Sequence, residues 1–285
     1  MRQLLSRVAI IGPGLLGGSI GLACKDQGYE VSFWGRNEER LTPVREAGFT
    51  ASTDLKQVIA NADLIILAIP VPYMAQMSEQ LIEAGLTKGQ LVTDVGSVKH
   101  AVVEAVQPVL STVGYQFIGS HPMAGSEQQG FSAAKASILQ EAMCIVTPDS
   151  YSELSQLERL RSFWGSLGMK VTELTTEQHD EIVSRVSHVP HLLASVCAHV
   201  ALPKPGNGQY AGGGLKDTSR VASGDPELWT GIVSENSAEI VTHLGEAIER
   251  LQEYQRAISK EDLEGLKELL TQDKLRRDGY YASGE

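Results

Sequence analysis

Residues 12–17 read GPGLLG, which places three glycines at the spacing GxGxxG directly after a short apolar run, Val8–Ile11. A segment of helical period, Leu15–Gln27, follows at once. In a strand–turn–helix unit the glycines allow a tight turn, a close approach of the backbone to a pyrophosphate, and close packing of helix on strand. The motif therefore predicts dinucleotide binding rather than a turn without a ligand, and the predicted contacts are Gly12, Gly14, Leu15, Leu16 and Gly17.

The first half of the chain alternates short apolar runs with segments of helical period, which is typical of a mostly parallel sheet covered by helices. The expected strands are Val8–Ile11, Val31–Trp34, Leu64–Ile69, Leu91–Val95, Gln116–Gly119, Met143–Thr147 and Lys170–Leu174. The expected helices between them are Leu15–Gln27, Asn37–Ala47, Met74–Ala84, Val98–Val109 and Ser152–Leu167. The fold class is therefore α/β of the Rossmann type.

After Thr176 the strand-like runs stop and helical segments dominate, so we expect a nucleotide-binding domain over residues 1–175 and an all-helical domain over 176–285. A single large domain is the alternative. The expected helices are Glu177–Leu202, Glu227–Glu253 and Lys260–Leu270, and Pro190 should kink or split the first of them. Loop residues over 203–208, and glycines at 212–214, predict a flexible connection between the first two helices.

Composition excludes several classes of function. A formal net charge of −11 argues against a nucleic-acid partner, because phosphate binding needs a basic surface. No apolar run has the length of a membrane span, so no membrane association is expected. Cys24, Cys144 and Cys197 are widely spaced in apolar segments, which suits buried thiols in a reducing cytoplasm, and no metal site is expected.

The choice of nicotinamide cofactor depends on the end of the second strand, where NAD enzymes place a carboxylate on the ribose 2′-hydroxyl. Here Gly35, Arg36 and Asn37 follow the strand, and the guanidinium of Arg36 suits a 2′-phosphate. We therefore predict NADP, with NAD as the alternative if an acid further along takes the role. Ile69 and Pro70, after a later strand, are expected to line the same cleft.

Four further motifs occur in order along the chain. Residues 94–99 read DVGSVK, residues 121–127 read HPMAGSE, residues 187–191 read SHVPH, and DTSR at 217–220 continues to Trp229. Together with the glycine loop, these motifs resemble the prephenate/arogenate (cyclohexadienyl) dehydrogenase family over nearly the entire chain. The resemblance implies oxidative decarboxylation of prephenate or arogenate in tyrosine biosynthesis.

The resemblance implies a catalytic role for His121, as acceptor of the substrate hydroxyl proton, and for Ser97, which orients the histidine and that hydroxyl. A neutral imidazole can accept a proton at cytosolic pH. Taken alone, His121 would be better explained as a loop histidine that satisfies backbone near Pro122.

The family pattern also implies substrate contacts at Arg220, His191, Glu127 and Trp229. A guanidinium binds a carboxylate well, although a salt bridge of Arg220 with Asp217 is the alternative. His188 and His191 lie three residues apart, but no third metal ligand of the expected kind is suggested nearby.

The sequence departs from the family pattern where Gly-Leu-Lys at 214–216 replaces the more typical Gly-Phe-Arg, which leaves the partners of Arg220 open. Two other readings remain: a β-hydroxyacid dehydrogenase that uses Lys216, and a sensor that binds NADP without catalysis. Prephenate is preferred over arogenate as substrate. From the resemblance we expect a homodimer through the helical domain, and any inhibition by tyrosine is expected to act at the active site.

Overall fold

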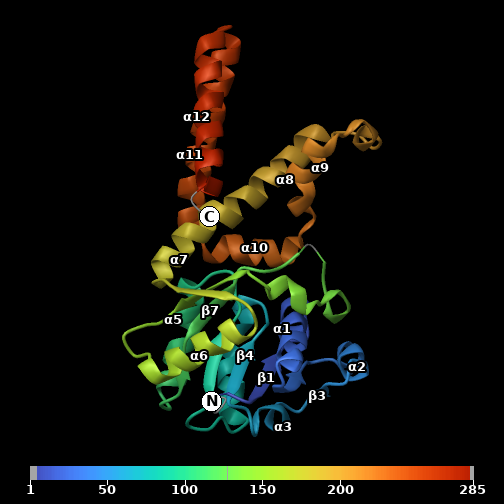
Figure 1. Ribbon diagram of the computed structural model, residues 1–285, viewed down its shortest axis with the longest axis vertical. Helices are drawn as coiled ribbons and strands as arrows, with labels where there is room; N and C mark the ends of the chain where they lie inside the picture. Colours follow the sequence, from blue (N-terminus) through green and yellow to red (C-terminus); the bar gives the residue numbers. More distant parts are fainter. Residues whose placement is uncertain (1–4, 127, 283–285) are drawn as a thin grey trace. The chain divides into compact units, whose positions relative to one another are not determined.

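The computed structural model describes residues 5–126 and 128–282 (Figure 1). Contacts between Cα atoms divide the chain into two compact units, one ending at Ser237 and the other covering Ala238–Glu285. Each unit is described by itself below.

The first unit is built on a six-stranded parallel sheet in the order β3-β2-β1-β4-β5-β6. β1 pairs with β2 on one side and with β4 on the other, so the order reverses at this point. In sheets of this kind, ligands bind beyond the carboxyl ends of the strands at the point of reversal. The strands are β1 Arg7–Ile11, β2 Glu30–Trp34, β3 Thr50–Ser52, β4 Leu64–Leu67, β5 Leu91–Asp94 and β6 Gln116–Phe117.

Apolar side chains cover both faces of the sheet because they alternate along each buried strand. In β1, Val8 and Ile10 join one hydrophobic cluster, while Ala9 and Ile11 join the other. Helices α1 Leu15–Asp26, α2 Glu38–Glu46 and α6 Leu154–Ser166 supply the first cluster, and α3 Leu55–Ile59, α4 Met74–Glu83 and α5 His100–Ser111 supply the second. The predicted α/β class is confirmed, although sequence analysis missed the short elements α3 and β3.

A second, three-stranded sheet follows, formed by β7 Gly119–Pro122, β8 Met143–Thr147 and β9 Lys170–Glu173. The prediction of one strand over 116–119 was wrong, because the chain leaves the first sheet after Phe117 and pairs antiparallel with β8 from Gly119. The Thr93 hydroxyl donates to the carbonyl of Ile118 at 2.6 Å, which satisfies the backbone at the change of sheet. His121 consequently lies within a strand rather than in a loop.

The helices after β9 also differ in detail from their predicted ranges. The first consists of α7 Thr176–Val183, one π-helical segment over Ser184–His188 and α8 Val189–Ala201. The helical backbone continues without a break from Thr176 to Ala201, and the irregularity is the π-helical segment directly before Pro190, which accommodates the N–H that proline lacks.

Two other predictions after β9 were wrong. The glycines at 212–214 begin α9 Gly213–Ser219 rather than continuing a loop. The predicted helix over 227–253 is two helices, α10 Pro226–Glu235 and α11 Ser237–Ser259. Asn236 ends α10, and its buried side-chain amide donates to the carbonyl of Asp180 at 2.8 Å, a tertiary contact that local helical period does not reveal.

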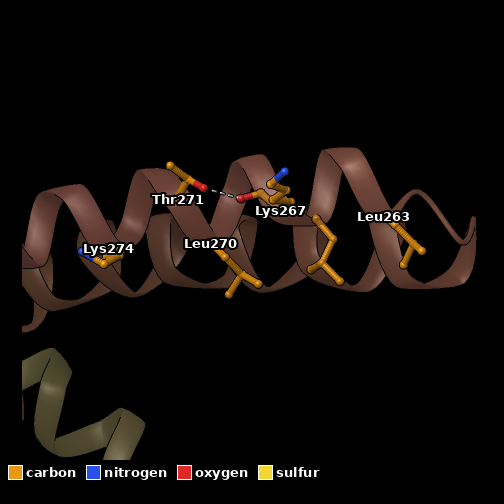
Figure 2. Close-up of a pocket in the computed structure, with 6 residues that line it drawn as sticks. Leu263, Lys267, Leu270, Thr271 and Lys274 are labelled. Carbon is orange, nitrogen blue, oxygen red and sulfur yellow. Dashed lines mark hydrogen bonds between the residues drawn. The ribbon is translucent and has the colours of Figure 1, made fainter.

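The second unit contains most of α11 and all of α12 Leu263–Ala282. Arg250 joins the two helices through an ion pair with Asp273 at 2.7 Å. Figure 2 shows Leu263 and Leu270 along α12, together with Lys267, Thr271 and Lys274, at a shallow pocket in its surface. Leu263 is 73% exposed and Leu270 is 55% exposed. Among the described helices, none combines the length and the low charge that crossing a membrane requires.

Candidate functional site

The glycine loop between β1 and α1 accepts only glycine at two of its three positions. Gly12 has φ +113°, and a Cβ there would lie 2.3 Å from the carbonyl oxygen of Ala68. A Cβ on Gly17 would lie 2.2 Å from the carbonyl oxygen of Gly12. Around Gly14, in contrast, nothing lies within 4 Å of a Cβ position. The tight turn therefore leaves open space at the middle glycine.

The amino end of α1 has the properties of an anion site. Gly14 is its extended N-cap residue, no side chain caps the helix, and its first turn contains no acid. The N–H groups of Leu15, Leu16 and Gly17 belong to this first turn, so they are available to an anion such as a pyrophosphate. The open space at Gly14 and the uncapped helix end together fit a dinucleotide.

At the end of β2, the side chain of Arg36 lies over an aromatic ring. The Arg36 guanidinium lies 5.8 Å from the centre of the Tyr73 ring. Tyr73 belongs to a 3₁₀ turn over 71–73 that follows Ile69 and Pro70. The side chain of Asn37 accepts from the N–H of Glu39 at 2.7 Å and caps α2. Gly35 is buried, and a Cβ there would lie 3.0 Å from Leu41.

Glu38, the first acid after β2, has other partners. Its carboxylate accepts from Arg45 Nη1 at 2.8 Å and from the Thr53 hydroxyl at 3.1 Å. These hydrogen bonds, that of Arg45 foremost, lower the pKa of Glu38. The alternative in which Glu38 binds a ribose hydroxyl would compete with these contacts.

His121 is almost completely buried on β7 and begins a chain of hydrogen bonds. Its Nδ1 lies 2.8 Å from Nε2 of His179, and Nδ1 of His179 lies 2.6 Å from Oδ1 of Asp180. Burial first, and then the nearby charges of His179 and Lys99, lower the pKa of His121 well below its ordinary value. The imidazole is therefore neutral near pH 7, as a proton acceptor must be.

A buried ion pair between Lys99 and Asp94 lies beside this chain of hydrogen bonds, and neither side chain is exposed. Asp94 also accepts from the N–H of Ser120 at 3.1 Å and from that of Gly96 at 2.7 Å. Because a buried charge needs several partners, these contacts hold the segment containing Ser97 at the carboxyl end of β5. Ser97 itself is half-buried.

His188 is fully buried and connects the helical segment to this site. Its Nδ1 lies 3.2 Å from the amide nitrogen of Asn236, and its Nε2 has no side-chain or backbone hydrogen bond. Burial lowers the pKa of His188 to about 4, although the nearby charge of Asp180 and the backbone of Ser97 oppose the shift. His188 therefore lies close to the backbone of Ser97 and close enough to His121 to influence the pKa of that imidazole.

His191 stacks on Trp229, with ring centroids 3.5 Å apart and an interplanar angle of 8°. Its Nδ1 is buried without a hydrogen-bond partner, so this edge of the ring could receive a ligand. Burial lowers the pKa of His191, and the backbone of Val221 opposes this shift. Arg220 precedes Val221 in a 3₁₀ turn over 220–223 and is exposed.

Trp229 also packs in the hydrophobic cluster that includes Ile69, so α10 and the loop after β4 lie together. The structure thus brings Ser97, His121, His188, His191 and Trp229 into one region, with the predicted cofactor loops at the neighbouring strand ends. Glu127 lies outside the described residues. Within the described chain, no three His, Cys, Asp or Glu side chains converge as a metal site would require.

Sequence analysis missed four members of the site: Asp94, Lys99, His179 and Asp180. Asp94 and Lys99 stand at the ends of the DVGSVK motif, so their charges in an otherwise apolar region were a usable signal. His179 and Asp180 gave no such signal, because an adjacent His-Asp pair in a helical segment is usually solvated.

The buried histidines predict a specific dependence of stability on pH. For His188 the folded pKa of about 4 lies below the ordinary value of 6.5, so the unfolded chain binds more protons between these limits. The free energy of unfolding should therefore fall by about 3 kcal/mol from this group alone as pH drops from 6.5 to 4. Chemical denaturation at both pH values measures this drop in the free energy of unfolding, and the drop should be about 3 kcal/mol smaller in His188→Gln than in the parent protein.

The matched control is His199→Gln, which alters an exposed histidine on α8 and should keep the pH dependence of the parent protein. Equal losses in the parent and in His188→Gln would contradict the assignment of the effect to His188.

A parallel sheet with an open glycine turn at its point of reversal, and a buried neutral histidine nearby, define a dinucleotide-dependent oxidoreductase. Two family models match the chain: "Prephenate dehydrogenase, nucleotide-binding domain" over residues 20–173 and "Prephenate dehydrogenase, dimerization domain" over residues 175–272. The chain belongs to the prephenate/arogenate (cyclohexadienyl) dehydrogenase family, as its motifs suggested.

Individual proteins agree with this assignment. The chain is 31% identical to the prephenate dehydrogenase of Bacillus subtilis, over 98% of this chain and 77% of that protein. It is 29% identical to the cyclohexadienyl dehydrogenase of Zymomonas mobilis, over 91% and 90% of the two chains. The structure of A. aeolicus prephenate dehydrogenase in complex with hydroxyphenyl propionate and NAD+ matches with a TM-score of 0.88 and 26% identity, over 97% and 98% of the chains. The Synechocystis arogenate dehydrogenase matches with a TM-score of 0.80 and 29% identity, over 96% and 99%.

Proposed function

We propose that this protein is a prephenate dehydrogenase that oxidatively decarboxylates prephenate to 4-hydroxyphenylpyruvate. The observation that carries the proposal is the buried, neutral His121, which lies near Lys99 after the carboxyl end of β5 and has Nδ1 already hydrogen-bonded to His179. This arrangement leaves Nε2 of His121 as the acceptor for the proton of the substrate hydroxyl.

In this mechanism the substrate lies between the strand ends and the helical segment. His121 removes the hydroxyl proton as a carbonyl develops on the same ring carbon, and Ser97 orients the hydroxyl. Arg220 binds a substrate carboxylate, and His191 and Trp229 form an adjoining wall. When bound, the nicotinamide cofactor supplies the hydride acceptor. Loss of the ring carboxylate then makes the ring aromatic.

The test of the substrate is to follow the reduced cofactor by absorbance with prephenate and, separately, with arogenate. Turnover of prephenate with little turnover of arogenate supports the proposal. The opposite preference would make the protein an arogenate dehydrogenase, and comparable rates a cyclohexadienyl dehydrogenase. Turnover of neither substrate would favour the sensor that binds a cofactor without catalysis.

We further propose that NADP is the preferred cofactor, because Arg36 follows β2 where no acid stands, and because Glu38 is engaged by Arg45. If Arg36 binds the 2′-phosphate, Arg36→Ala should raise the KM for NADP by about 10- to 100-fold, the value of a charged hydrogen bond. The KM for NAD should change by no more than about twofold, since NAD lacks that phosphate.

Arg40→Ala is the matched control for this experiment, because Arg40 is an exposed arginine on the adjacent helix α2. It should leave both Michaelis constants near their parental values. A clear preference of the parent enzyme for NAD would refute the choice of NADP.

We also propose that the helical part begins at Thr176 and forms a homodimer. Support comes from the end of the last strand at Glu173 and from the second family model, whose description is a dimerization domain. Exposed leucines on α11 and α12, including Leu251, Leu263 and Leu270, offer apolar surface for a second copy.

A further inference from the structure

The chain of hydrogen bonds behind His121 ends at the carboxylate of Asp180, which accepts hydrogen bonds from two backbone N–H groups and from His179. Oδ1 of Asp180 accepts from the N–H of Lys99 at 2.8 Å, and Oδ2 accepts from the N–H of His100 at 2.9 Å. Both donors lie at the amino end of α5, where the helix dipole favours negative charge. Burial would raise the pKa of Asp180, but hydrogen bonds from His179 and from these two N–H groups lower it.

This charge state determines where each proton in the chain lies. A carboxylate can only accept, so Nδ1 of His179 must carry the proton that it donates to Asp180. Burial lowers the pKa of His179, although Asp180 opposes the shift, so His179 is neutral and its Nε2 is a bare acceptor. Nε2 of His179 lies 2.8 Å from Nδ1 of His121, so Nδ1 of His121 must be the donor.

We propose that His179 and Asp180 are positioning residues that hold His121 in the Nδ1–H tautomer, with its bare Nε2 directed to the substrate hydroxyl. The inference rests on the proposed role of His121 as the proton acceptor. Among the described residues, no protein group is hydrogen-bonded to Nε2 of His121, and the residue as a whole is 7% exposed. The opposite tautomer would place a proton on Nε2 and would block acceptance.

The same contacts serve the protonated state. When the substrate hydroxyl gives its proton to Nε2, the imidazolium keeps its Nδ1–H donated to His179, and His179 stays hydrogen-bonded to the Asp180 carboxylate. The other ionisable groups facing His121 are the Lys99–Asp94 ion pair, His188 and the thiol of Cys144 opposite β7. Burial raises the pKa of Cys144, so that thiol stays neutral. Asp180 is therefore the anion that balances the new charge through His179.

The first test reads the tautomer directly and requires no substrate. In protein labelled with 15N at histidine, ring nitrogens with and without a proton have distinct 15N resonances, and His121→Asn identifies those of His121. At pH 7 and above, the parent protein should show a protonated Nδ1 and a bare Nε2 for His121. A proton on Nε2 in the parent protein would overturn the proposal, whatever the enzyme's substrate proves to be.

The second test compares His179→Phe, which keeps a ring without an acceptor, with His179→Gln, which keeps an oxygen acceptor for the His121 Nδ1–H. His179→Phe should lose the uniform Nδ1–H tautomer and lower kcat by about 10- to 1000-fold, part of the full contribution of acid–base catalysis. The KM values for substrate and cofactor should stay within about threefold. His179→Gln should restore the tautomer and most of kcat.

Parental kcat and an unchanged tautomer in His179→Phe would refute the positioning role. If His179→Phe does not fold, as judged by circular dichroism, the parental spectrum and His179→Gln decide the matter. A Gln variant that folds but has lost the Nδ1–H tautomer would likewise overturn the proposal. Failure of the proposed function is a separate outcome, seen as a correct tautomer in an enzyme that turns over neither prephenate nor arogenate.

Discussion

His121→Asn is expected to lower kcat by about 10²- to 10⁴-fold, because it removes the proposed acceptor of the hydroxyl proton. Asparagine can still contact His179, so the buried chain of hydrogen bonds should lose little of its order. The cofactor loops lie on other strand ends, so the KM for the cofactor should stay within about threefold. Steady-state kinetics with saturating cofactor and the better of the two substrates measures both quantities.

His199→Asn provides the matched control, since it makes the same substitution at an exposed histidine on α8. Its kcat should equal that of the parent enzyme. Full activity in His121→Asn would rule out the proposed mechanism, because the reaction would then proceed without His121 as the proton acceptor.

Arg220→Ala should raise the KM for the substrate by about 10- to 100-fold, since a hydrogen bond to a charged group contributes about 1.5–3 kcal/mol. The effect on kcat should be smaller, because the carboxylate that Arg220 is proposed to bind lies away from the hydroxyl. Arg220→Lys should recover only part of the affinity, because a lysine lacks the planar pair of donors.

Lys216→Ala is an informative control for Arg220→Ala. Lys216 is exposed on α9, one helical turn before Arg220, and it is the residue that a β-hydroxyacid dehydrogenase would use for catalysis. We expect parental kinetics from this variant. A severe loss of kcat in Lys216→Ala, together with unchanged KM in Arg220→Ala, would favour that other chemistry.

Most of the sheet could be predicted from the sequence because its strands are buried on both faces. Such strands are continuous apolar runs, and Leu64–Leu67 is an example that needs no tertiary information. Its predicted end was two residues too long, because Ala68 and Ile69 continue the apolar run but leave the ladder to support the glycine turn. Edge elements such as β3 were missed, since three residues are too few to show the alternation of apolar and polar side chains that identifies a strand.

The candidate site divides in the same way. Residues in compact motifs, such as Ser97 and His121, could be named from sequence because their neighbours along the chain accompany them. Asp180 could not be named from sequence, because the hydrogen bonds that make it part of the site come from the amino end of α5, which lies about 80 residues earlier in the chain.

The dinucleotide turn could be recognised from the sequence alone, since the positive φ of Gly12 and the contact of Gly17 with the Gly12 carbonyl both arise within one strand–turn–helix unit. The motifs likewise indicated the family. The way His121 is held could be seen only in the folded chain, because its tautomer depends on His179 and Asp180, which a separate helix brings to it. A proton position set by a buried carboxylate is a property of the assembled interior, where each donor must meet an acceptor. No pattern along the chain encodes that requirement.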